Sequence, residues 1–122
     1  MVIEWFKENL LEGFATIEKH GIVLNKTASK CLEYATAVRV GIDKEKKRVV
    51  LKALSLDEYQ NIEENKENAL KLSVATSYTK ISNTALVHRL EEIFGFSAGR
   101  SIKIPAVFDT KLNYLILNMK EV

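Results

Sequence analysis

The stretch from Gly21 to Leu54 constrains the fold most, because it holds a complete structural unit. In order it predicts a short strand, a short helix, and two strands joined by a charged turn. Asn25 is placed to accept a hydrogen bond from the free amides of the first helical turn. The helix puts its apolar residues on one side: Ala28, Cys31, Leu32 and Ala35. A unit of this size cannot cover its own apolar faces, so it needs a second layer.

The last third of the chain carries a second copy of this pattern. The first matches share an offset of 58 (81 − 23): Val23, Asn25, Leu32 and Glu33 correspond to Ile81, Asn83, Leu90 and Glu91. After an eight-residue insertion around 95–100, Asp43 matches Asp109 and 49–51 matches 115–117, an offset of 66 (109 − 43). Two such units related by an approximate twofold axis can close a small barrel-like sheet.

The predicted fold class is therefore α+β, with two β-α-β-β repeats forming a small pseudo-twofold barrel-like sheet. We expect one domain spanning residues 1–122. Repeat one covers 14–54, a helical acidic connector covers 55–69, and repeat two covers 70–119.

The sequence also predicts the structure of three further segments. Residues 2–12 have apolar side chains at helical spacing and predict an N-terminal helix that ends at Gly13. The connector begins with Ser55-Leu-Asp-Glu58, which fits a capping box. Its apolar side chains are expected to face inward: Leu56, Tyr59 and Ile62. Pro105, inside the strand predicted from Ser101 to Phe108, favours an edge strand or a bulge.

Few residues suggest catalysis or metal binding. The single cysteine, Cys31, lies on the apolar side of its helix, which favours a buried thiol over a nucleophile. His20 and His88 are far apart in the sequence and do not make a metal site. Gly95-Phe-Ser97-Ala-Gly99 matches a nucleophile elbow by letters, but the helix precedes the serine and neither histidine follows it. We therefore expect that the protein is not an enzyme and that it binds neither a metal ion nor a cofactor.

The net charge and the pattern of apolar residues limit the classes of partner that the chain can have. A formal net charge of +2 permits nucleic-acid binding without arguing for it, because DNA-binding domains usually carry a larger basic excess. No apolar run reaches the roughly 18 residues of a membrane-spanning helix. Glu4 and Glu8 interrupt the apolar N-terminus, unlike a secretory signal. The expected location is the cytoplasm.

A strand, an asparagine cap, one short helix and a two-stranded hairpin resemble the AbrB/MraZ superfamily of swapped-hairpin DNA-binding domains. Two copies in one chain are most similar to the MraZ arrangement, in which the halves form an intramolecular pseudo-dimer. The resemblance covers about 14–54 and 72–119. Lys19 and Gly21 echo the family's Asp-x-Lys-Gly-Arg signature, but its arginine is missing from both halves. Asn25 and Asn83 replace the family's cap proline.

The resemblance implies a homo-oligomeric DNA-binding transcriptional regulator or antitoxin-like protein. We expect a strand surface with Lys19, Arg39, Lys80 and Lys103 to contact phosphates. The full candidate nucleic-acid-binding set is Lys19, Lys26, Arg39, Lys46, Lys47, Arg48, Lys80 and Lys103. The missing arginines and near-balanced charge favour an alternative, a non-enzymatic protein-protein interaction module that keeps the fold without DNA binding. A protein partner would then contact the first helix through Trp5 and Phe6.

Overall fold

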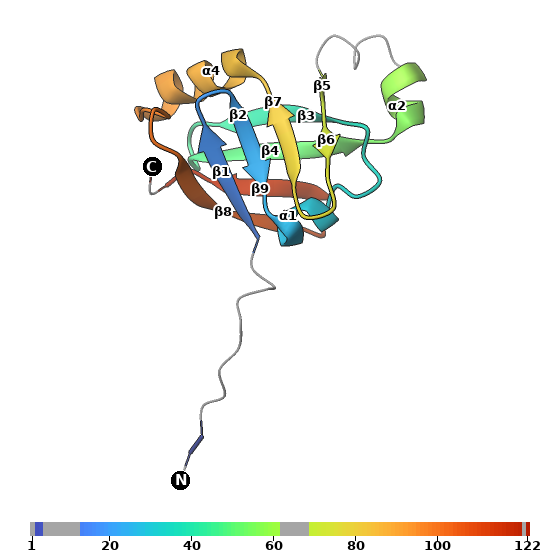
Figure 1. The fold of residues 1–122 in the computed structure, drawn as a ribbon, viewed down its shortest axis with the longest axis horizontal. Coiled ribbons are helices and arrows are strands. Elements are labelled where there is room, and N and C mark those ends of the chain that lie inside the picture. The colour runs from blue at the N-terminus through green and yellow to red at the C-terminus, as the bar shows by residue number, and fades with distance from the viewer. Residues whose placement is uncertain (1, 4–12, 62–68, 121) are drawn as a thin grey trace.

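The computed structural model describes residues 2–3, 13–61, 69–120 and 122 (Figure 1). Within them, nine strands form one antiparallel sheet in the order β5-β3-β4-β9-β8-β1-β2-β7-β6. The strands are β1 Phe14–Glu18, β2 Gly21–Leu24, β3 Ala37–Asp43, β4 Arg48–Leu54, β5 Ala69–Lys71, β6 Ser73–Val74, β7 Thr79–Ser82, β8 Ile102–Asp109 and β9 Tyr114–Asn118. The helices are α1 Lys26–Lys30, α2 Leu56–Asn61 and α4 Thr84–Phe94.

The sheet curves until its two edges meet. β5 and β6 stand at opposite ends of the strand order, yet only Leu72 separates them in the chain. The Leu72 N–H donates to the carbonyl of Thr36, just before β3, over 3.3 Å. The result is a nearly closed barrel, with β1, β2 and β7 forming one wall and β3, β4 and β9 the other (Figure 1). The predicted α+β class and barrel-like sheet are confirmed at this level.

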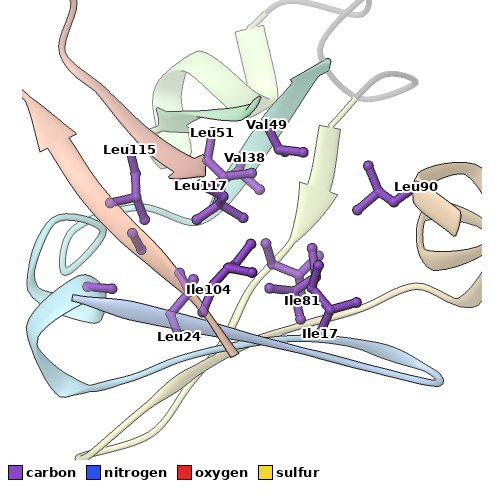
Figure 2. Close-up of a cluster of buried hydrophobic side chains, with 14 of the residues drawn as sticks. Ile17, Leu24, Val38, Val49, Leu51, Ile81, Leu90, Ile104, Leu115 and Leu117 are labelled. Carbon is purple, nitrogen blue, oxygen red and sulfur yellow. The ribbon is translucent and has the colours of Figure 1, made fainter. Parts of the chain in front are cut away.

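The core fills the space between the two walls. Alternation along β1 leaves Ala15 and Ile17 without exposed surface, and β9 buries Leu115 and Leu117 in the same way. Ile17, Leu115 and Leu117 are among the side chains that gather between the two walls in Figure 2. Each fully buried leucine or isoleucine stabilises the fold by about 1.5–3 kcal/mol. Leu90, from the middle of α4, covers one end of this core.

Both predicted asparagine caps are confirmed. The Asn25 Oδ1 accepts from the backbone N–H of Ala28 at 3.0 Å, and the Asn83 Oδ1 accepts from that of Leu86 at 2.8 Å. Asn25 also accepts from the Phe14 N–H at 3.1 Å, so the same side chain fixes α1 to the start of β1. α4 ends where predicted, at Gly95, whose φ of 69° suits a glycine.

The two long hairpins turn in the same way. In the β3–β4 turn, Asp43 Oδ1 accepts from the Lys46 N–H, and Lys47 has a positive φ of 51°. In the β8–β9 turn, Asp109 Oδ1 accepts from the Leu112 N–H, and Asn113 has a φ of 61°. The corresponding residues are all 66 positions apart (109 − 43, 112 − 46, 113 − 47).

One part of the predicted strand alignment is wrong. Val23 points outward and is half-buried, whereas Ile81 has no exposed surface. The pairs Thr16–Val23 in β1–β2 and Ser73–Lys80 in β6–β7 correspond at an offset of 57 (73 − 16, 80 − 23). At this offset Leu24, directly before the Asn25 cap, corresponds to Ile81, so the last residue of β7, Ser82, is one extra residue before the Asn83 cap. A one-residue shift exchanges the two faces of a strand, which explains the mismatch.

Three smaller expectations also need correction. α1 ends at Lys30, although Leu32 beyond it is buried as expected. Leu56 does not face inward, because 52% of it is exposed. β8 is an internal strand, but Pro105 pairs only with Phe14 on the β1 side, and pairing with β9 begins at Ala106. The proline therefore costs no hydrogen bond in the β8–β9 ladder.

Some expectations fall outside the described residues. The N-terminal helix, with Trp5 and Phe6, belongs to this group, as does Ile62 with the rest of the connector to residue 68. The capping box that starts the connector is confirmed, since Ser55 and Glu58 exchange two hydrogen bonds of 3.2 Å. Within the described part of the chain, no helix is both long and apolar enough to span a membrane.

Candidate nucleic-acid interface

Two of the predicted contact residues lie in one row across the outer surface of the barrel. The register aligns Lys80 with Val23, Val23 with Thr16, and Thr16 with Lys103. We call these four side chains, from β7, β2, β1 and β8, the basic row. With about 4.8 Å between neighbouring strands, the two lysine Cα atoms are roughly 14 Å apart. The row thus presents two cations with a small, partly apolar surface between them.

Neighbouring side chains hold both lysines in place. Lys80 Nζ lies 3.8 Å from a carboxylate oxygen of Glu18, and both side chains remain partly exposed to solvent. Lys103 Nζ lies 4.2 Å from the centre of the Phe14 ring, a cation–π contact. A partly exposed ion pair of this kind adds at most about 1 kcal/mol to stability. Glu18 therefore matters more for how strongly the row attracts an anion.

Two other predicted residues lie near the ends of this wall. Lys19 is exposed in the turn between β1 and β2, directly after Glu18. Lys26 is exposed at the start of α1, beyond the opposite end of β2. Lys19 can extend the basic row, whereas Lys26 belongs to the other end of the barrel.

The expected surface of Lys19, Arg39, Lys80 and Lys103 does not exist as one face. Arg39 is on β3, in the wall opposite β1 and β2 (Figure 1). Its direct cross-strand neighbour is Lys52 on β4, and both line a shallow hollow of about 280 Å³ with Tyr114. The sequence places Arg39 correctly on a strand but does not reveal how the strand order wraps. Lys52, omitted from the predicted set, follows from the register of the hairpin.

The hairpin tip carries the last three predicted residues. Lys46 and Lys47 are exposed, and Arg48 Nε donates to Asp43 Oδ2 at 3.1 Å. The backbone N–H of Lys46, followed by Arg48, lowers the pKa of Asp43 from its ordinary value. The Met119 N–H donates to the carbonyl of Lys47, which fixes the tip against the end of β9. Arg48 is already engaged, so this cluster offers fewer free cations than its composition suggests.

The lowered pKa of Asp43 predicts how the hairpin responds to acid. Because the folded state favours the carboxylate, its contribution is present above the ordinary aspartate pKa and is lost as pH falls through the folded value. Asp43→Asn should therefore lower the free energy of unfolding at pH 7, and the difference from wild type should shrink below about pH 4. Urea titrations at both pH values measure this. A difference that stays constant with pH would contradict it.

The described part of the chain offers little support for metal binding or nucleophilic catalysis. No group of three or more histidine, cysteine or acidic side chains lies close enough there to hold a metal ion. Ser97 is exposed in the turn after α4. Burial raises the pKa of the half-buried Cys31 thiol, opposite to the shift that activates a nucleophile.

Comparison of the chain with models of known protein families, with curated proteins and with solved structures finds no match.

Proposed function

We propose that the protein is a DNA-binding regulator of the swapped-hairpin type, formed by two repeats in one chain. Strand pairing between the halves carries the proposal. The β3–β4 hairpin of the first half lies between β5 and β9, both from the second half. The β8–β9 hairpin of the second half lies between β1 and β4, both from the first. Each hairpin is thus held by strands of the other half, as the resemblance implies.

The proposed duplication is also supported by local features that strand pairing between the two halves would not by itself require. The two Asn caps accept from residues three positions ahead, and the two hairpin turns place a positive φ at corresponding positions. The strands correspond at an offset of 57, the Asn caps at 58 and the hairpins at 66. One extra residue before the second cap and eight extra residues in the loop after α4 account for these differences. A pseudo-twofold axis passes near the pair Val50–Ile116, whose members are themselves 66 positions apart (116 − 50).

The DNA contact is assigned to the basic row. Lys80 and Lys103 are separated by about 14 Å, comparable to the rise of roughly four base pairs along one strand. Lysine is a flexible point charge and suits phosphate contacts rather than base recognition. The resemblance also implies a homo-oligomer, which would place several basic rows along one duplex. Light scattering measures the number of chains in that oligomer.

Variants on the two walls test this assignment. We expect the double variant Lys80→Ala/Lys103→Ala to bind a fluorescent random-sequence duplex more weakly at low salt. Each lost phosphate contact should also reduce the slope of log Kd against log salt by about 0.9. Lys52→Ala is the matched control, an exposed lysine on the opposite wall. Glu18→Gln should tighten binding, because it removes the anion 3.8 Å from Lys80.

If the double variant and Lys52→Ala lost the same amount of duplex affinity, the basic row would not be the interface. Circular dichroism melts separate this outcome from misfolding.

A second candidate function is a protein-interaction module without DNA binding. Exposed apolar side chains on the outer surface of β8 favour it, above all Val107, which is 63% exposed. Retained binding of a protein partner by the Lys80→Ala/Lys103→Ala variant, with no duplex binding by wild type, would select this function.

A further inference from the structure

A row of apolar residues crosses the outer face of the wall that contains β3, β4 and β9. Strand pairing aligns Gly41 with Val50, Val50 with Ile116, and Ile116 with Val107 in the second half of β8. The residues that alternate with them are buried in the core, so these four face outward. Val50 and Ile116 are half-buried, whereas Val107 is exposed. We call these four residues the apolar row.

Charged side chains border the apolar row on both sides. On one side Arg39 and Lys52 stand directly opposite each other, and Asp109 lies on the same side at the β8 end. On the other side Asp43 and Arg48 form the ion pair of the hairpin turn. An apolar centre with a rim of both charge signs is typical of a contact between proteins, whereas a surface for nucleic acid is predominantly basic.

Two of these charged groups lack a partner within the described residues. Arg39 makes no ion pair or hydrogen bond there and faces the like charge of Lys52, which is an unfavourable cross-strand pair. Asp109 accepts from Lys111 and Leu112 through Oδ1 only, so its Oδ2 is left without a partner in the same part of the chain. Arg39 and Asp109 stand three strands apart, roughly 14 Å, and cannot meet within one chain.

We propose that a second copy of this chain docks on this face, around a twofold axis that runs parallel to the strands between β4 and β9. This rotation sets β3 of one copy over β8 of the other and β4 over β9, and it keeps the apolar row over itself. Val50 then packs on the partner's Ile116, and Val107 packs on the partner's Gly41. Each contact forms twice because the interface is symmetric.

Shape and charge both fit this axis. Gly41 leaves a recess, because an added Cβ atom would have no neighbour nearer than Val50 at 3.9 Å. The exposed Val107 of the partner fills that recess. Arg39 comes to lie over the partner's Asp109, so each unpartnered cation meets an unpartnered anion. Packed sheets are about 10 Å apart, a distance that an arginine and an aspartate side chain span together.

The other twofold axis in this face, which runs along the apolar row, is unfavourable. It would set each strand over its own copy, with Lys52 against the partner's Arg48, because these two residues lie on opposite sides of Val50 in β4. Like charges placed against each other weaken a contact between proteins. The charge pattern therefore selects one orientation of the two chains.

The dimer leaves the proposed DNA interface open. The basic row lies on the other wall of each barrel, so both basic rows remain exposed on the outer sides of the dimer (Figure 1). The inference specifies the homo-oligomer of the proposed function and does not depend on DNA binding. The face is small compared with a stable interface, so we expect a weak dimer that dissociates on dilution.

Sedimentation velocity of the full chain over a series of concentrations tests the dimer. Wild type should pass from monomer to dimer in the micromolar range. Val107→Asp should raise the dimer Kd at least about tenfold, because it places an unpaired carboxylate against the partner's apolar row. Val74→Asp is the matched control, an exposed valine of β6 outside this face, and should leave the Kd unchanged.

Two further variants test the charge and the recess separately. Asp109→Asn keeps the Oδ1 acceptor of the turn but removes the charge, so it should weaken the dimer and make the Kd less sensitive to salt. Gly41→Val should weaken the dimer by filling the recess, without lowering the melting temperature of the monomer at high dilution.

A wild-type chain that stays monomeric at high concentration would overturn the proposal. A dimer whose Kd is unchanged in both Val107→Asp and Gly41→Val, with both variants melting like wild type, would also overturn it. Neither result bears on the basic row, because the duplex titrations of Lys80→Ala/Lys103→Ala test that assignment independently.

Discussion

Leu90→Asp is expected to leave the protein unfolded. Leu90 has no exposed surface, and its side chain points from α4 toward the core at the end of the barrel (Figure 2). Burying an unpaired carboxylate costs several kcal/mol, which is comparable to the total stability of about 5–15 kcal/mol typical of small domains. Circular dichroism and urea titration measure the loss of folded structure.

His88→Asp provides the control on the same helix. His88 is exposed, so this variant should change the free energy of unfolding by no more than about 0.5 kcal/mol. A soluble Leu90→Asp variant with a cooperative melt near that of wild type would contradict the packing of α4 on the barrel.

Gly21→Ala should weaken the junction between the halves. Gly21 lies in β2, opposite Ser82 of β7, and a Cβ atom there would come within 2.3 Å of the Ile81 carbonyl oxygen. The backbone must shift to relieve this contact, at an expected cost of about 1–3 kcal/mol. Thermal and urea unfolding measure the change.

Gly41→Ala is the matched control, because Gly41 is also a strand glycine. The nearest neighbours of its added Cβ would be atoms of Val50 at 3.9 Å, an ordinary van der Waals contact. Alanine should therefore leave stability unchanged or raise it by up to about 1 kcal/mol. Equal effects at the two glycines would show that the close approach of β2 and β7 is not a constraint.

The local elements could be predicted from the sequence because their signals lie within a few residues. Asn25 and Asn83 each precede an apolar helical pattern, and both cap a helix in the structure. The serine and glutamate of the connector exchange the expected hydrogen bonds. Such caps depend only on neighbouring backbone amides, so local chemistry determines them.

The arrangement around the barrel could not be predicted in the same way. Arg39 and Lys80 both occupy strands, but which wall each strand joins depends on long-range pairing that leaves no local signal. The alignment of Val23 with Ile81 failed for a related reason, because one extra residue before a cap reverses which face is buried. The role of Gly21 as a close approach between strands likewise depends on a partner far away in the sequence.

The wild-type protein titrated against a fluorescent random-sequence duplex at about 50 mM and 150 mM salt tests the central claim most directly. The account predicts micromolar binding at low salt that weakens steeply at the higher salt, because lysine–phosphate contacts release counterions. No change in anisotropy at low salt, with the protein folded and at high concentration, would contradict DNA binding by the basic row.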